Sequence, residues 1–232
     1  MPQLFCRRHE IEGPTMVEPE TFTFLTDLAA NNRKIWMDEN REDRDDALRN
    51  FTGIASTLHD YADRFNHNVA AAKSKPKQSY TKFFQEARDR SGPGLYRTDI
   101  DVFANAGNPF EEVGYYLHIE PGNCYAGAGL SRPSKETLAR MRSRLMDDPQ
   151  EIIALENDTD FKTAFPEGIT TRKALNVVPD GFDVTAPTLK YLKMVGLECR
   201  AHVTEEELLD DDAIYKIIEI FRSASPLVRY FE

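Results

Sequence analysis

Residues 114–130 read GYYLHIEPGNCYAGAGL, and this stretch decides the fold. Two runs rich in aromatic and aliphatic residues flank Pro121 and Gly122. Proline presets φ at the first central position of a turn, and glycine permits a positive φ at the second, which is the signature of a type II turn. The pattern therefore predicts an antiparallel hairpin in which this turn joins strands 114–120 and 123–130.

The alternation of side chains along the hairpin separates a polar face from an apolar one. A two-residue loop places His118 opposite Tyr125 and Tyr116 opposite Gly127, on the same face as Glu120. A histidine beside a carboxylate can serve as a general base, so His118 and Glu120 are the candidate catalytic residues. Tyr116 and Tyr125 are candidate ligand-binding residues, and Gly127 leaves room for an approach to the backbone. The alternative is that these residues form the solvated face of a half-buried sheet.

Residues 98–104 alternate in the same way and predict a further strand. Ile100 and Val102 lie on one side of it, and Asp99 and Asp101 lie on the other. If this strand pairs with the hairpin in a suitable register, both carboxylates join the polar face. Carboxylates beside a histidine can bind a hard metal ion, so Asp99 and Asp101 are also candidate metal ligands.

The segments before and after this strand-rich middle have helical periodicity. This order predicts the α+β class, with a central, mostly antiparallel sheet flanked by N-terminal and C-terminal helices. Apolar spacing predicts helices within residues 19–36, 47–65, 134–145, 184–195 and 204–221, with shorter helical pieces around Ile152 and Phe161. Additional short strands are predicted at residues 80–84, 175–178 and 197–203.

Residues 1–15 differ from the rest of the chain because they lack periodicity and end in the turn sequence GPT before a second methionine, Met16. They form either a loosely ordered arm or an extra segment upstream of a start at Met16. The acidic start of a helix just after Met16 favours the second interpretation. Residues 16–232 are predicted to form a single domain.

The composition is typical of a globular protein with a sizeable core: of 232 residues, 41% are hydrophobic and 10% aromatic. No run approaches the ~18 uncharged apolar residues of a membrane span. Charged residues fill the positions where an export signal needs its apolar segment. Three widely spaced cysteines fit a reducing compartment better than a disulfide framework. We therefore expect a cytoplasmic protein with no membrane association.

Charge is distributed unevenly along the chain. Residues 73–97 hold seven basic and two acidic side chains, a local net charge of +5; the whole chain carries −10, which leaves −15 elsewhere. A basic segment on an acidic protein suits a small anion, and Arg88, Tyr96 and Arg97 are its candidate ligand-binding residues. The acidic remainder argues against a nucleic-acid partner. The alternative is a solvated loop whose charges pair with the acidic body.

The sequence lacks the motifs that would indicate a cofactor or a reaction. It has no phosphate-binding G-x-x-x-x-G-K-[ST] loop, no C-x-x-C pair and no H-E-x-x-H helix. Gly127 and Gly129 could begin a dinucleotide-binding fingerprint, but Arg132 stands where the third glycine is needed. The cofactor is therefore unknown from the sequence.

Three motifs, taken in order, resemble those of a known family. They are FLTDLAANNRKIW at residues 24–36, YYLHIEP at 115–121 followed by GAGL at 127–130 and Pro133, and PDGFD at 179–183 followed by Pro187. Together they are similar to the DUF2461 proteins, a family defined by a domain of unknown function, from Thr21 to Phe231. The resemblance supports a start near Met16. It implies no activity, because the family carries none that is established.

The same resemblance bears on the basic loop. Arg88, Tyr96 and Arg97 fall on positions that match the family's pattern. Gln85 stands where members of the family have arginine, and Pro93 stands where they have lysine. If the family's loop binds an anion, the resemblance implies that this chain keeps two arginines and lacks two other basic donors.

Three hypotheses follow from the sequence, and whether the protein is an enzyme stays open. The preferred hypothesis is a small-anion site between residues 88–97 and the polar face of the hairpin. The second is a non-catalytic module in which the same loop docks on an acidic protein partner. The third is a metal-dependent hydrolase that uses Asp99, Asp101, His118 and Glu120 on one face of the sheet.

Overall fold

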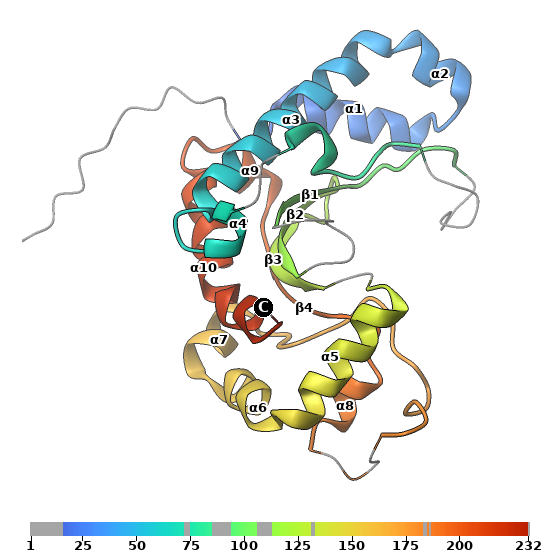
Figure 1. Cartoon of the computed structure of the whole chain (residues 1–232). Coiled ribbons are helices and arrows are strands. Elements are labelled where there is room, and N and C mark those ends of the chain that lie inside the picture. The colour runs from blue at the N-terminus through green and yellow to red at the C-terminus, as the bar shows by residue number, and fades with distance from the viewer. Residues whose placement is uncertain are drawn as a thin grey trace, which may run out of the picture.

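The computed structural model describes residues 16–71, 75–84, 94–105, 113–130, 133–182, 185 and 187–231. In these residues a four-stranded antiparallel sheet has helices before and after it in the chain, which confirms the predicted α+β class (Figure 1). The strands are β1 (Ile100–Asn105), β2 (Gly114–Ile119), β3 (Tyr125–Leu130) and β4 (Leu197–His202).

The helices fall into three groups along the chain: before β1, between β3 and β4, and after β4. Before it come α1 (Pro19–Ala30), α2 (Lys34–Glu39), α3 (Arg41–Ala62), α4 (His67–Ala71) and the 3₁₀ turn η1 (Pro76–Gln78). Between β3 and β4 lie α5 (Lys135–Asp147), α6 (Pro149–Asn157), α7 (Thr159–Ala164) and α8 (Leu189–Leu192). After β4 come α9 (Glu205–Leu209) and α10 (Ala213–Phe231). None of the described helices is long and apolar enough to cross a membrane.

The strand order is β1-β2-β3-β4, so neighbours in sequence are neighbours in space. The predicted hairpin is confirmed: His118 pairs with Tyr125 and Tyr116 with Gly127. Its turn has Gly122 at φ 80°, the left-handed conformation that a type II turn requires. Asp101 pairs with His118 across β1 and β2, so the strand that begins near Asp99 does join the hairpin in register.

Helices α3 and α10 pack on the apolar face of the sheet (Figure 1). Residues such as Ile100, Leu117 and Ala126 alternate onto that face and are fully buried. Tyr115 stacks on Phe221 of α10 with ring centroids 5.1 Å apart. Each buried leucine or isoleucine side chain contributes about 1.5–3 kcal/mol to stability, so this layer holds the sheet to its helices.

Single bridges extend the sheet at both of its edges. Tyr80 pairs with Val102 beside β1, and Thr170 pairs with Glu198 beside β4. The strand predicted at residues 80–84 is therefore an extended edge segment with isolated bridges. These edge segments bring parts of the chain from outside the four strands to the rims of the sheet.

Local signals at two helix starts agree with the structure. The Ser134 side chain accepts the backbone N–H of Thr137 at the start of α5. Thr204 and Glu207 form a capping box at the start of α9. Both motifs satisfy N–H groups that the first turn of a helix leaves free.

Three predicted elements of the C-terminal third are wrong in extent. The helix predicted at residues 204–221 divides into α9 and α10, because the Asp210 side chain accepts the backbone N–H of Asp212 and competes with the helix. Of the helix predicted at residues 184–195, the described residues form only the single turn α8, and the backbone N–H of Val195 beyond it donates to Lys173. Residues 175–178 make no strand; the only bridge next to them joins Ala174 to Met194 in the described chain.

Candidate functional site

The register in which the strands pair brings polar side chains together on one face of the sheet. Asp101, His118 and Tyr125 form one row across β1, β2 and β3. Arg200 and Glu198 alternate onto the same face from β4, opposite the glycines of β3. The sequence left open a solvated face formed by Tyr116, His118, Glu120 and Tyr125. That alternative is wrong for the centre of the face, because the two tyrosines and His118 are buried, whereas Glu120 at its edge is partly exposed.

His118 is held on three sides. Its Nδ1 lies 2.7 Å from Asp101 Oδ1, and its Nε2 lies 3.3 Å from Glu120 Oε2. Its ring stacks on Tyr125 at a centroid distance of 4.3 Å. An imidazolium donates from both nitrogens, so the two carboxylates together favour the charged form of His118 and fix its orientation.

The protonation of His118 and Asp101 follows from these contacts. Burial opposes charge on both groups. Burial is the largest single influence on His118, but the hydrogen bond and charge of Asp101, with the hydrogen bond to Glu120, together outweigh it and raise the pKa of His118. In the same way, the hydrogen bond from His118 and the charge of Arg172 hold the pKa of Asp101 well below its usual range. These contacts therefore favour an imidazolium paired with a carboxylate.

Arg172 connects the two outer strands. Its Nη1 and Nη2 donate to the Asp101 oxygens at 3.3 and 3.2 Å, and its Nε lies 3.6 Å from Glu198 Oε2. The bridge between Thr170 and Glu198 places this segment beside β4, and alternate residues of an extended chain share a side. Arg172 thus contacts one buried acidic side chain at each rim of the sheet.

Glu198 and Tyr116 form the far end of the network. Burial raises the pKa of Glu198, and it raises that of Tyr116 well above its ordinary value. The Tyr116 hydroxyl donates to Glu198 at 3.5 Å. The arginine next along β4, Arg200, lies over the Tyr125 ring at 5.2 Å and binds Glu167 at 3.1 Å. The tyrosine hydroxyls of this face are therefore neutral hydrogen-bonding groups.

Gly127 does not leave space for a ligand, as its position opposite Tyr116 had suggested. A Cβ built on Gly127 would collide with the backbone carbonyl of Cys199 on β4. A Cβ on Gly129, whose φ is 148°, would meet the backbone of β4 in the same way. The glycines of β3 therefore allow β4 to approach closely, and through it Glu198.

The basic loop reaches the polar face at its C-terminal end. Arg97 Nη1 lies 3.5 Å from Asp99 Oδ2, and both residues alternate on the same side as Asp101. Tyr96 points the other way: it packs against the main core and lies edge-on to Phe84. Arg88 lies outside the described residues.

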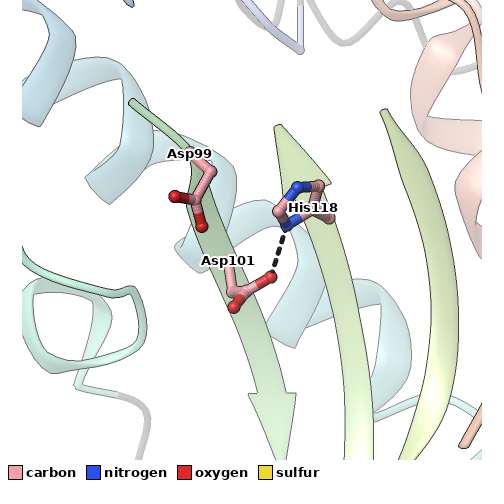
Figure 2. A group of neighbouring side chains, drawn as sticks. All are labelled: Asp99, Asp101 and His118. Atoms are coloured by element: carbon pink, nitrogen blue, oxygen red, sulfur yellow. Dashed lines mark hydrogen bonds and ion pairs between the residues drawn. The ribbon is translucent and has the colours of Figure 1, made fainter. Parts of the chain in front are cut away.

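Asp99, Asp101 and His118 form a group that could hold a metal ion (Figure 2). One ligand atom from each residue lies within 4.8 Å of the other two. The Asp101 oxygens, however, already accept hydrogen bonds from His118 and from Arg172. A cation bound there would have to displace a guanidinium.

The sequence predicted seven residues of this face, namely Arg97, Asp99, Asp101, Tyr116, His118, Glu120 and Tyr125. It did not predict Arg172, Glu198 or Arg200. Glu198 and Arg200 alternate within the strand predicted at residues 197–203, which is a signal that could have found them. Arg172 carried no such signal, because it lies 71 residues from Asp101 in sequence.

The fold and the site define an α+β protein that buries a network of charged groups on one face of its sheet. The chain belongs to DUF2461, a family of conserved hypothetical proteins whose model matches residues 20–230. No curated protein and no solved structure gives a significant match.

Proposed function

We propose that the protein binds a small anionic molecule on the polar face of the sheet, with donors from the hairpin and from the basic loop. The observation that carries this proposal is that the end of the basic loop contacts the polar face of the hairpin strands. Arg97, at the end of the loop, contacts Asp99, which belongs to the same group of side chains as Asp101 and His118. Cationic donors from the basic loop and from the hairpin therefore lie on the same face of the sheet.

Glu120 indicates where the anion binds. Its carboxylate accepts from His118 Nε2 at 3.3 Å and from Asn123 Nδ2 at 2.6 Å. The Glu120 side chain is 37% exposed, whereas that of His118 is only 6% exposed. An incoming carboxylate or phosphate oxygen can replace this outer, partly exposed partner and use the same charge-assisted donors.

Asp101 and Arg172 act as positioning residues for this exchange. The bond from His118 Nδ1 to Asp101 keeps Nε2 directed at Glu120 and at any ligand that replaces it. Arg172 keeps Asp101 ionised. Tyr116 and Tyr125 supply the neutral hydroxyls of the site, and Arg88 remains a predicted ligand-binding residue; Tyr96, which points away from this face, is not part of the proposed site.

The same geometry suits acid–base chemistry at His118. An imidazole whose Nδ1–H is bound to a buried carboxylate presents Nε2 for proton transfer. Glu120 is the second titratable group within reach of that nitrogen. A turnover, if the ligand undergoes one, would therefore begin with a proton passed between His118 Nε2 and the bound anion.

Thermal unfolding of the full chain against inorganic phosphate, carboxylates, sugar phosphates and nucleotides tests the proposal. A ligand at a hundred times its Kd stabilises the fold by about 2.7 kcal/mol, which raises Tm by about 5–11 °C in a chain of this size. The shift is expected to vanish in Arg97→Ala and His118→Gln. Arg229→Ala, an exposed arginine on α10, is the matched control and should keep it. No shift with any anion would contradict the proposal and favour the protein-interaction module.

A metal-dependent hydrolase is the second candidate, favoured by the arrangement of Asp99, Asp101 and His118. It ranks lower because Arg172 already neutralises Asp101. Titration with Mn²⁺ and Zn²⁺ separates the two proposals. Saturable metal binding that Asp99→Asn abolishes and Arg172→Met strengthens would favour the hydrolase. Binding that is indifferent to both substitutions would exclude this metal site.

A further inference from the structure

The outer rim of the polar face carries carboxylates as well as cationic donors. The Asp99 side chain is 27% exposed and that of Glu120 is partly exposed too, whereas Asp101 lies deeper and is almost fully buried. A ligand that approaches His118 from solvent therefore meets two carboxylates beside the donors that it is proposed to use.

Both outer carboxylates lie next to the His118 ring. One oxygen of Asp99 lies within 4.8 Å of a ring nitrogen of His118 (Figure 2), and Glu120 Oε2 lies 3.3 Å from Nε2. The last pair of β1 and β2 at this end of the sheet is Ile100 with Ile119. Asp99 and Glu120 follow directly beyond it, and alternation turns both to the face of His118. The two carboxylates and the imidazole therefore border one surface.

Each outer carboxylate is held by a long ion pair. Arg97 Nη1 lies 3.5 Å from Asp99 Oδ2, and this is the only hydrogen bond of the Asp99 side chain among the described residues. His118 Nε2 lies 3.3 Å from Glu120, whereas the inner bond from Nδ1 to Asp101 measures 2.7 Å. Charge-assisted N–H···O bonds are about 2.7–2.9 Å long. Both outer pairs can therefore open to a ligand that offers each member a better partner.

We infer that the anion bound on the polar face is part of a small zwitterion, in which an ammonium group stands next to the carboxylate or phosphate. This inference rests on the proposed function and names the class of its ligand. The anionic group accepts from His118 Nε2 and from Arg97. The ammonium group donates to the carboxylates that this exchange releases, Asp99 and Glu120. Ammonium has three donors and no acceptor, so it complements carboxylates, which only accept.

Ligands with a single sign of charge fit the same surface less well. A plain anion satisfies His118 and Arg97 but leaves two carboxylates beside it, and like charges side by side are unfavourable. A plain amine meets the opposite problem, because it lies beside a guanidinium and an imidazolium. A zwitterion places each charge of the site next to an opposite one.

Pairs of ligands that differ only in the ammonium group test this inference. Glycine is compared with acetate, and aminoethyl phosphate with ethyl phosphate, by NMR titration of the isotope-labelled full chain at neutral pH and constant ionic strength. In the pair whose anionic group the site accepts, the zwitterion is expected to bind about 2- to 10-fold more tightly than the plain anion. The two pairs together distinguish a carboxylate ligand from a phosphate ligand.

Variants of the outer carboxylates assign the preference to the site. Asp99→Asn should bring the Kd values of zwitterion and plain anion toward equality. Glu120→Gln should reduce the same preference while it strengthens binding of the plain anion, which then has no internal competitor. Glu205→Gln, whose carboxylate binds the backbone N–H of Gly122, is the matched control and should keep the wild-type preference. Because the readout is a ratio within one protein, a loss of stability does not mimic it.

Failure of this inference is distinct from failure of the proposed function. Plain anions that bind as tightly as their zwitterions would overturn the zwitterion and leave anion binding on the polar face in place. A preference that survives unchanged in both Asp99→Asn and Glu120→Gln would do the same. No binding of any of the four ligands would overturn both.

Discussion

The two faces of the sheet are made by alternate residues of the same strands, and both are buried, yet different forces stabilise them. The face under α3 and α10 carries aliphatic side chains such as Ile100 and Leu117, whose burial needs no partner. The opposite face buries Asp101, His118 and Glu198, which must be neutralised in place by one another and by Arg172. Apolar residues stabilise through area removed from water, whereas buried ion pairs barely repay their desolvation.

This difference separates what holds the fold from what serves the proposed site. An apolar sheet face of the same volume would stabilise the protein at least as well as the charged one. The charged face therefore contributes chemistry that an apolar face could not. It supplies hydrogen-bond donors of fixed direction and a histidine whose orientation is fixed by its bond to Asp101.

Removing one member of the charged network should have the largest effect. Asp101→Asn keeps the side-chain volume but leaves the buried His118 and the partly exposed Arg172 without their common carboxylate. Breaking a buried pair in this way costs about 3–5 kcal/mol, to be measured by urea unfolding. The half-buried Asp99→Asn is the matched control, with a smaller expected loss. A loss below about 1 kcal/mol for Asp101→Asn would contradict the network.

A cavity made in the apolar face tests whether the two faces of the sheet act independently. Leu117→Ala, at a fully buried position, should cost about 2–5 kcal/mol. It should leave the NMR titration of His118 unchanged, because the two side chains lie on opposite faces. Asp101→Asn should lower the pKa of His118 as well as the stability. If Leu117→Ala shifted that titration too, the two faces could not be treated as independent.

The stability of the charged face should depend on pH with a definite sign. The folded state raises the pKa of His118, so its contribution is fully present below the unfolded pKa of about 6.5 and is lost as pH rises through the folded pKa. Wild type should therefore lose stability relative to His118→Gln over this window. Each pH unit by which the pKa is raised accounts for about 1.4 kcal/mol. If the stability of wild type relative to His118→Gln stayed constant or grew with pH, a raised pKa of His118 in the folded state would be contradicted.

The smallest expected effect on stability lies at the exposed end of the network. Glu120→Gln should change the free energy of unfolding by less than about 1 kcal/mol, because a partly exposed ion pair is worth little. It should still strengthen anion binding, since it removes the carboxylate that competes for His118 Nε2. Glu205→Gln, near the same turn, is a control that should leave anion binding unchanged. Weaker binding in Glu120→Gln would place the anion elsewhere.

Much of the fold was predictable because it rests on local signals. The Pro121-Gly122 turn fixed the register of the hairpin, and alternation around Asp101 placed the carboxylate beside His118. The boundary between α9 and α10 was missed, because the side-chain bond at Asp210 competes with a helical pattern that continues on both sides.

The rest of the site depends on contacts between distant segments. Nothing in the sequence around Arg172 indicates that its guanidinium reaches Asp101 and Glu198, since a bridge at Thr170 places it. The burial of the polar face was also beyond the sequence, because alternation marks the polar side of a strand but not whether water reaches it. Tyr96 and Arg97 are adjacent, and alternation sends only Arg97 to the polar face.

Titration of the isotope-labelled full chain with inorganic phosphate, followed through the His118 ring nitrogens by NMR, is the direct test of anion binding at His118. We expect a saturable shift at Nε2, together with a Kd about 2- to 10-fold lower in Glu120→Gln, where the internal carboxylate no longer competes. Ring nitrogens of His118 that stay unmoved at saturating phosphate, or a Kd that rises in Glu120→Gln, would contradict it.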